Sequence, residues 1–176
     1  MSTLNQKLSS ISQEDFNFLI KNGKRSSKIL NFDFESLIYL KWGLLKEQVP
    51  DLFIKNDFEQ LFYLMLQDRK QFVFLADVQK IEVNQAMSFI LWLIDEMKTI
   101  SELESTYLRS DPDVKLLQAG INKLDQLGVK NTLFNLGGKD PKQHEIIRNT
   151  PYNEIFDIQF WCVITSDIEK KLAKIK

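Results

Sequence analysis

The sequence predicts an all-α fold, a single-domain irregular bundle of about six to eight helices around one long central helix. Proline and glycine are scarce, with 4 and 6 among 176 residues, so few positions interrupt a helix. Apolar residues recur at three- and four-residue spacing in several segments, which places them on one helix face. The longest such segment, 82–108, is apolar on nearly every side between Ala86 and Ile94. A helix of that kind needs burial all round, so we expect it at the centre.

Length and composition bound the class of protein. A chain of 176 residues with 44% hydrophobic content can bury one core, so we expect one domain over residues 1–176, with residues 1–11 a flexible lead. The net charge of −1, from 23 basic and 24 acidic side chains, creates no strong field toward nucleic acid or anionic membranes. Residues 1–12 lack the apolar stretch of a secretory signal, and charges after Ile94 interrupt the longest apolar run. We therefore expect neither secretion by a signal peptide nor a membrane span.

A capping pattern marks the first helix. Ser12 followed by Asp15 predicts a helix through about Lys21, which Asn22-Gly23 ends. The reason is that a serine side chain accepts hydrogen bonds from the free amides of a first turn, whereas glycine readily leaves the helical conformation.

Two more helices are predicted before the central one. Asp33 is expected to cap the first, whose apolar face continues until Pro50 stops it. Gly43 lies inside that helix and marks a place where another backbone comes close. One of residues 56–57 opens the second helix. The segment 71–83 is either a strand or a helix end, because periodicity cannot decide so short a run.

Helices of the second half begin where a capping residue precedes proline. The pairs are Asp111-Pro112, Asp140-Pro141 and Thr150-Pro151. The first residue of each pair caps the free amides, and proline suits a first turn, where its missing N–H is not needed. The first of these helices is expected to run to Gly128, with Gly120 allowing a close crossing. The last is expected to run from Tyr152 to about Lys174.

No reactive motif is complete. Residues 137–140 superficially resemble a phosphate loop, but Leu133 stands where a Walker motif needs glycine, and Asp140 where it needs serine or threonine. We interpret the two glycines as a helix stop. His144 is the only histidine and lacks the partner of a usual nucleophile–base pair. Cys162, the only cysteine, lies in an apolar stretch, where we expect a buried, inert thiol.

Carboxylates are numerous but are spaced as on solvated helix faces. Glu102 and Glu104 cannot face each other on a helix, and Asp111 and Asp113 are better suited to capping. One histidine and one cysteine leave only carboxylate ligands for a metal, and no calcium-loop pattern is present. We therefore expect no catalytic residue, cofactor, metal or small-molecule substrate. An enzyme that uses carboxylates from distant positions stays open as an alternative.

Two aromatic-rich helix faces are the candidate partner surfaces. The chain has 13 phenylalanines and 3 tryptophans without a reactive constellation, which suits a protein whose function is a surface. One face lies in 86–94 and the other in 156–164. The candidate contact residues are Phe89, Trp92, Leu93, Phe156, Phe160, Trp161 and Ile164. Both faces also fit a plain core, and the sequence does not distinguish the two.

A second hypothesis is a small helical regulator that binds nucleic acid. Its basic residues are Lys21, Lys24, Arg25 and Lys28, or the C-terminal tail 170–176. No aromatic residues interleave with the first cluster, as binding to a single strand requires. We therefore expect protein partners, with nucleic acid as the alternative.

Four segments of the second half resemble small helical proteins encoded in the structural gene modules of tailed bacteriophages. They are Trp92–Glu104, Ser110–Gly128, Asn131–Gly138 and Thr150–Phe156. The resemblance rests on the order of their Asp-Pro, Ala-Gly-Ile, Leu-Gly, Asn-Thr-Leu and Pro-Tyr elements. It implies a role in virion assembly without enzymatic activity, as a tail or neck component or as a tail assembly chaperone. It also implies self-association or docking to other virion proteins, in the host cytoplasm during assembly or in the virion.

Overall fold

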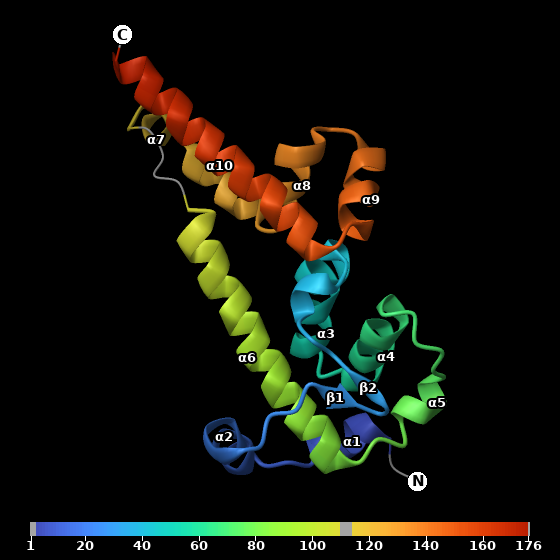
Figure 1. Cartoon of the computed structure of the whole chain (residues 1–176). Coiled ribbons are helices and arrows are strands. Elements are labelled where there is room, and N and C mark those ends of the chain that lie inside the picture. Colours follow the sequence, from blue (N-terminus) through green and yellow to red (C-terminus); the bar gives the residue numbers. More distant parts are fainter. Residues whose placement is uncertain (1–2, 110–113, 176) are drawn as a thin grey trace.

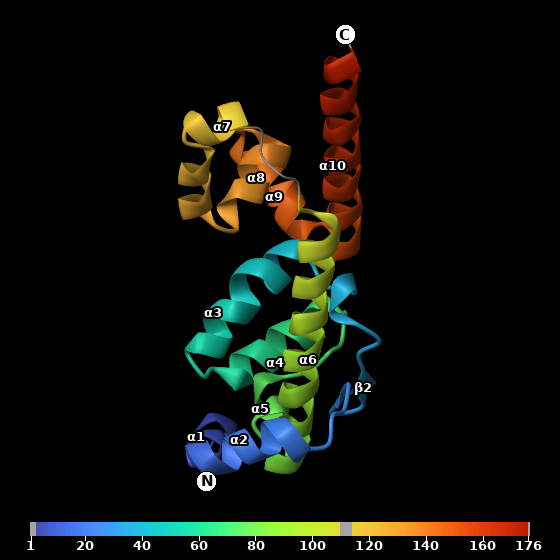
Figure 2. The same cartoon turned by 90° about the vertical axis from the view of Figure 1, so that its left-hand side faces the viewer.

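The chain folds around one long helix, α6 (Val83–Tyr107), in a computed structural model that describes residues 3–109 and 114–175 (Figure 1). Shorter helices surround the first part of α6 and form with it what we call the N-terminal body, residues 3–107. The remaining described helices lie beyond the end of α6, and the last, α10 (Tyr152–Ile175), projects furthest from the body (Figure 2). The predicted mainly helical class and its long helix are confirmed.

A helix, α1 (Leu4–Ser9), stands where the sequence predicted a flexible lead over residues 1–11. Thr3 caps it, since its side chain accepts a hydrogen bond from an amide of the first turn. Leu4 and Leu8 lie one turn apart and are both buried in the core. Two leucines at helical spacing thus give this short helix an apolar side that packs on the body.

The next helix, α2 (Gln13–Asn22), has the start and end that the sequence predicted. The Ser12 hydroxyl accepts a hydrogen bond from an amide of the first turn, and Gly23 follows the last residue. A tight hairpin comes next, in which β1 (Lys28–Ile29) pairs antiparallel with β2 (Phe32–Asp33). This hairpin joins α2 to the helical turns that follow.

The helix predicted from Asp33 to Pro50 does not form as one piece. Asp33 pairs within the hairpin, and a separate 3₁₀ turn follows as η1 (Leu37–Tyr39). A later helix passes through a π-helical turn, η2 (Leu44–Gln48), and continues as α3 (Val49–Ile54). Pro50 therefore lies near the start of α3 instead of ending a helix. Proline is tolerated in the first turn of a helical segment, and π turns are among the places where a helix ladder is locally interrupted.

Two helices, α4 (Phe58–Asp68) and α5 (Leu75–Val78), complete the body before α6. Of the two residues expected to open α4, 56 and 57, Asp57 caps it, with its carboxylate accepting a hydrogen bond from the Gln60 amide. The segment 71–83, for which the sequence left a strand or a helix end open, contains irregular backbone followed by the short helix α5.

The hydrophobic core lies around the first two thirds of α6. Most apolar residues of α6 between positions 86 and 93 are buried, and they pack with side chains from α1, η1, η2 and α4. Aromatic rings contribute to this packing, since the centroids of Phe62 and Phe89 lie 5.3 Å apart in an edge-to-face arrangement. Burial on several sides is what the nearly uninterrupted apolar run of this helix predicted.

The C-terminal part is a series of short helices followed by α10. Their order is α7 (Val114–Gln118), the 3₁₀ turns η3 (Ile121–Leu127), α8 (Lys130–Gly137) and α9 (Pro141–Asn149). The helix expected to run to Gly128 is instead interrupted at Gly120, whose φ of +87° is a left-handed conformation. No close crossing occurs there, because the atoms nearest to an added Cβ belong to the exposed Lys123 side chain. The predicted restart at Asp111-Pro112 lies outside the described residues.

Few residues of this C-terminal part are buried. Leu133, Ile147, Tyr152 and Ile155 join the core, whereas every other buried apolar residue of the described chain comes from positions 4–100. Helix α10 is confirmed over its predicted range, and its fully buried residues, Tyr152 and Ile155, lie in its first turns. Further along, Gln159 donates to the Thr132 hydroxyl of α8 at 3.4 Å, and one side of the helix is only partly exposed. The rest of α10 extends beyond the body (Figure 2), and the side opposite its partly buried residues is exposed.

Candidate interaction surface

The projecting part of α10 carries a stripe of exposed apolar side chains. Six of them are between 43% and 80% exposed, and their spacing of three or four residues aligns them along one helix face. They are Ile158, Trp161, Ile164, Ile168, Leu172 and Ile175. We call this set the α10 stripe. Contiguous apolar surface of this kind marks places where proteins bind other molecules.

The anchored side of α10 lies opposite the stripe. Tyr152 and Ile155 are 1% and 2% exposed and fix the start of the helix on the body. Residues nine positions apart are separated by roughly two and a half turns of a helix with 3.6 residues per turn, so they lie on opposite sides. Trp161 and Ile164 follow Tyr152 and Ile155 at that spacing. The stripe therefore faces away from the body because the first turn of α10 is held by its other face.

Glu104, near the end of α6, connects three elements through a polar cluster. Its carboxylate accepts hydrogen bonds from Lys46 Nζ at 2.7 and 2.8 Å and from the Tyr152 hydroxyl at 2.8 Å. Lys46 belongs to η2 and Tyr152 begins α10, so the cluster ties α6 and η2 to the helix that carries the stripe. Burial, reinforced by the hydrogen bond to Glu104, raises the pKa of Tyr152 well above its ordinary value. The hydroxyl therefore stays protonated as a donor.

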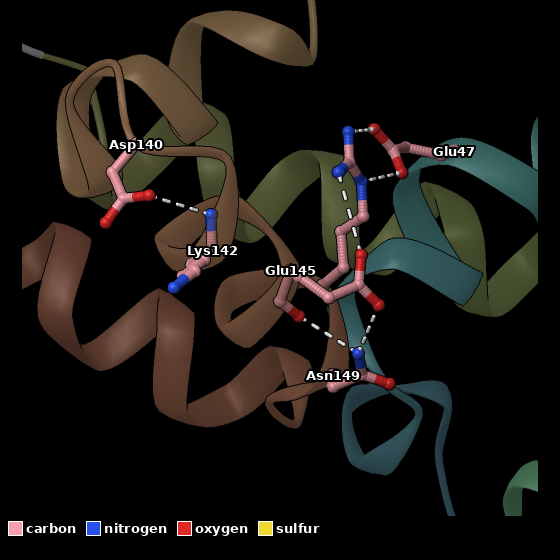
Figure 3. Close-up of polar contacts among 6 residues, drawn as sticks. Glu47, Asp140, Lys142, Glu145 and Asn149 are labelled. Atoms are coloured by element: carbon pink, nitrogen blue, oxygen red, sulfur yellow. Dashed lines mark hydrogen bonds and ion pairs between the residues drawn. The ribbon is translucent and has the colours of Figure 1, made fainter.

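A second ion pair connects the body to α9. Arg148 donates to both carboxylate oxygens of Glu47, from Nε at 2.7 Å and from Nη2 at 3.2 Å. Figure 3 shows Glu47 beside α9, on which Asn149 donates to Glu145 at 2.7 Å. The hydrogen bond to Glu47 raises the pKa of Arg148 above its ordinary value. The two-point contact fixes the angle between α9 and the body more firmly than a single hydrogen bond.

Backbone hydrogen bonds hold the connection between α9 and α10. The amides of Trp42 and Tyr152 donate to the carbonyls of Thr150 and Leu40, both at 2.8 Å, and an isolated antiparallel β-bridge lies between them. The Thr150 hydroxyl donates back to the Ile146 carbonyl, so its side chain stabilises the end of α9. The predicted restart at this position thus also serves as a backbone link to the body.

Gly43 allows α9 to approach the body closely. A Cβ at this position would lie 2.9 Å from Arg148 Cβ and 3.2 Å from the Arg148 carbonyl oxygen, so the expected close approach of another backbone is confirmed. A cleft of about 390 Å³ opens beside the contact. Its charged groups are of both signs, and Lys41 Nζ lies 3.7 Å from the Asp68 carboxylate inside it. Mixed charges that pair with one another give the cleft no preference for a ligand of one sign.

Residues at the start of α9 that drew attention in the sequence stabilise local structure. The His144 ring bonds through Nε2 to the Gly138 carbonyl oxygen at 2.8 Å and packs edge-on against Phe134. Asp140 accepts a hydrogen bond from the Lys142 amide at 2.9 Å, which is the predicted cap (Figure 3). Both side chains therefore hold the turn between α8 and α9.

The structure divides the seven predicted contact residues between core and surface. Phe89 and Leu93 are fully buried in the core, so they offer no surface to a partner in this chain as it folds alone. Trp92 is half-buried and packs on Phe34 and Phe89, with ring centroids 6.1 and 5.2 Å away. Trp92 therefore completes the core as Phe89 does.

The contact residues predicted on α10 keep more of their surface. Phe156 and Phe160 are half-buried against the body, with the Tyr107 ring 5.6 Å from Phe160. Trp161 and Ile164 are 65% and 43% exposed and belong to the stripe. Four further stripe residues were missed: Ile158, Ile168, Leu172 and Ile175. Their helical spacing was visible in the sequence, but nothing there said that no neighbour covers them.

Cys162 is exposed, which corrects the expectation of a buried thiol. It lies on the projecting part of α10, next to Trp161, where an apolar stretch of sequence is not buried in the core. The expectation for Glu104 is also corrected. Its spacing suggested a solvated helix face, but its carboxylate connects α6 with η2 and α10.

The first basic cluster is partly occupied by contacts within the chain. Arg25 donates to the Asp95 carboxylate at 2.9 Å and to the carbonyls of Gly23 and Ile20 at 2.5 Å. Lys28 lies 3.6 Å from the Asp33 carboxylate, while Lys21 and Lys24 are exposed. The arginine therefore fastens the loop after α2 to α6, and no contact here favours a bound nucleic acid.

The fold and this surface define a mainly helical protein whose last helix presents an uncovered apolar face. Comparison of the chain with protein-family models, with curated proteins and with solved structures finds no match. Within residues 3–109 and 114–175, no three His, Cys, Asp or Glu side chains gather as metal ligands. Over the same residues, no helix combines the length and apolar character needed to cross a membrane.

Proposed function

We propose that this chain is a non-enzymatic protein-interaction protein that serves as a structural or assembly component of a tailed bacteriophage. It acts in the tail or neck, or as a tail assembly chaperone, and its partners are proteins. The observation that carries the proposal is the α10 stripe, a row of exposed apolar side chains on a helix that projects from the body. The link to bacteriophages rests on the resemblance of segments within residues 92–156.

The size of the stripe suits a reversible contact. Complete burial of one large apolar side chain contributes about 1.5–3 kcal/mol. The six stripe residues are roughly half exposed, so covering them yields on the order of 5–9 kcal/mol by the same measure. Association costs about 4–15 kcal/mol in lost freedom of motion. The stripe by itself therefore supports a weak contact, and further contacts are needed for a permanent one.

The stripe is also held in a defined position. The hydrogen bond from Tyr152 to Glu104 and the ion pair between Arg148 and Glu47 fix α10 and α9 on the body. A surface that is already ordered loses little conformational entropy on binding, so less of the binding free energy is offset. This favours a docking helix over a loose tail.

Point variants of this chain, introduced into the phage genome that encodes it, test this function. Ile168→Asp places a charge in the middle of the stripe at a side chain that is 51% exposed, so we expect normal folding by circular dichroism. We also expect few infectious particles, with tails missing or incomplete by electron microscopy. Ala173→Asp adds the same charge at an exposed position of α10 outside the stripe, and we expect an unchanged particle yield.

Full infectivity of the Ile168→Asp virus would contradict the proposal, and so would normal particle yield after deletion of the gene. Mass spectrometry of purified particles then separates the two roles. A virion component is retained in the particles, whereas an assembly chaperone is absent from them.

A further inference from the structure

The α10 stripe contains the spacing of a coiled-coil seam. Positions 158, 161, 165, 168, 172 and 175 are separated alternately by three and four residues, so the pattern repeats every seven. Five of these positions carry exposed apolar side chains, and the sixth is Thr165. Ile164 widens the seam on one side. A helix with this pattern packs well against another helix, because each seam side chain inserts into a hole formed by four side chains of the facing helix.

The seam is symmetric about its midpoint, between residues 166 and 167. A second copy of α10 that runs in the opposite direction therefore meets the first in matched layers. The layers are Ile158 with Ile175, Trp161 with Leu172, and Thr165 with Ile168. Each layer contains a large apolar side chain and none contains a charge, so the whole seam is buried in this arrangement.

The charges of α10 favour the same direction. Glu154 and Asp157 come four residues before Ile158 and Trp161, so they lie on the stripe's face at the end next to the body. Lys171 and the residues after it make the opposite end basic. An antiparallel pair places the basic end of each helix beside the acidic end of the other, whereas a parallel pair places the lysines side by side.

The position of the body also separates the two directions. The body lies at the start of α10, and the stripe spans 18 residues, about 27 Å at 1.5 Å per residue. A parallel pair places the two bodies at the same end of the paired helices. An antiparallel pair places them at opposite ends, where each is clear of the other.

We propose that the partner of the α10 stripe is a second copy of this chain, paired antiparallel through α10. This inference rests on the proposed function, since it names the protein that the interaction surface binds. It commits to a two-fold symmetric dimer, in which the same residues contribute from both copies.

Light scattering across a wide range of protein concentration tests the pairing. We expect the mass to rise from one chain to two as concentration increases. Ile168→Asp introduces two charges into the centre of the dimer, and we expect a dissociation constant at least about 100-fold higher. Ala173→Asp is the matched control, because it adds the same charge outside the seam and leaves dimerisation unchanged. A single-chain mass at every concentration, or equal effects of both variants, overturns the proposal.

Disulfide formation tests the direction. With Cys162→Ser as the background, Ile158→Cys and Ile175→Cys are prepared as separate proteins. We expect a cross-linked species only when the two are mixed, because the two positions share a layer in the antiparallel pair. Cross-linking of Ile175→Cys with itself indicates a parallel pair and overturns the proposed direction.

The two proposals fail independently. If the chain is monomeric but Ile168→Asp abolishes infectivity, the stripe binds another protein, so the proposed function stands and self-pairing is wrong. If the chain forms the antiparallel dimer but deletion of the gene leaves particle yield normal, the assembly role is wrong and the dimer stands.

Discussion

The Tyr152 hydroxyl donates a hydrogen bond to the Glu104 carboxylate at 2.8 Å, although 48 positions separate the two residues in the sequence. Lys46 Nζ approaches the same carboxylate at 2.7 Å and lies 5.7 Å from the centre of the Tyr152 ring. Three polar groups thus satisfy one another where little water reaches the tyrosine, which is 1% exposed. This contact sets the direction in which α10 leaves the body.

Removing the hydroxyl tests how much this contact contributes. Tyr152→Phe leaves the Glu104 carboxylate short of one donor, and a hydrogen bond to a charged group contributes about 1.5–3 kcal/mol. We expect the free energy of unfolding in urea to fall by that amount. Tyr107→Phe, at a tyrosine that is 46% exposed, should change it by less than about 0.5 kcal/mol. Equal effects of the two variants would show that the buried hydrogen bond adds no stability.

The raised pKa of Tyr152 predicts a loss of stability at alkaline pH. An unperturbed tyrosine loses its proton near pH 10. Below that pH both the folded and unfolded chains hold the proton, so the contribution of this group is complete. Above it the unfolded chain releases a proton that the folded chain retains, so the free energy of unfolding falls by about 1.4 kcal/mol per pH unit.

Chemical unfolding at a series of alkaline pH values checks this sign. Other groups titrate in the same range, so the informative quantity is the difference between the original chain and Tyr152→Phe. The variant has no proton to lose at this position, and its stability should decline less steeply above pH 10. Parallel declines would mean that the folded tyrosine titrates at its ordinary pKa.

Gly43→Ala separates helix propensity from close packing. In a helix with open space, this change stabilises a protein by about 0.4–1 kcal/mol. Here the new Cβ meets Arg148 Cβ at 2.9 Å and its carbonyl oxygen at 3.2 Å, so the contact between α9 and the body has to open. We therefore expect a destabilisation of about 1–3 kcal/mol in thermal or urea unfolding. A gain in stability would show that the two backbones move apart at no cost.

Leu4→Ala tests whether α1 belongs to the core. Leu4 is fully buried, and truncation of a buried leucine costs about 2–5 kcal/mol. Ile54→Ala, at a side chain that is 82% exposed, serves as the control and should be nearly neutral. If Leu4→Ala left the free energy of unfolding unchanged, residues 1–11 would be the flexible lead that the sequence suggested.

Several helices could be predicted from the sequence because their signals are local. The caps at Ser12, Asp57 and Asp140 hydrogen-bond to amides within the next few residues, so their effect does not depend on the rest of the fold. The long apolar run of α6 likewise predicted a buried central helix. The region around Pro50 could not be predicted, since a π turn that accommodates the proline has no recognisable sequence signal.

The candidate surface was predicted only in part. Helical periodicity places Phe89 and Leu93 on one face of α6, and Trp161 and Ile164 on one face of α10, with equal clarity. The first pair is fully buried and the second exposed, because the body packs around α6 and leaves most of α10 uncovered. Cys162 was misplaced for the same reason.

The sequence by itself determined the helical class, the long central helix and the residues that share each helix face. Only the tertiary structure decided which of those faces are covered, and it brought Glu104 to Tyr152 and Glu47 to Arg148 across long stretches of chain. The physical reason is that helix formation depends on hydrogen bonds between neighbours in sequence, whereas burial depends on which distant segments pack against each face.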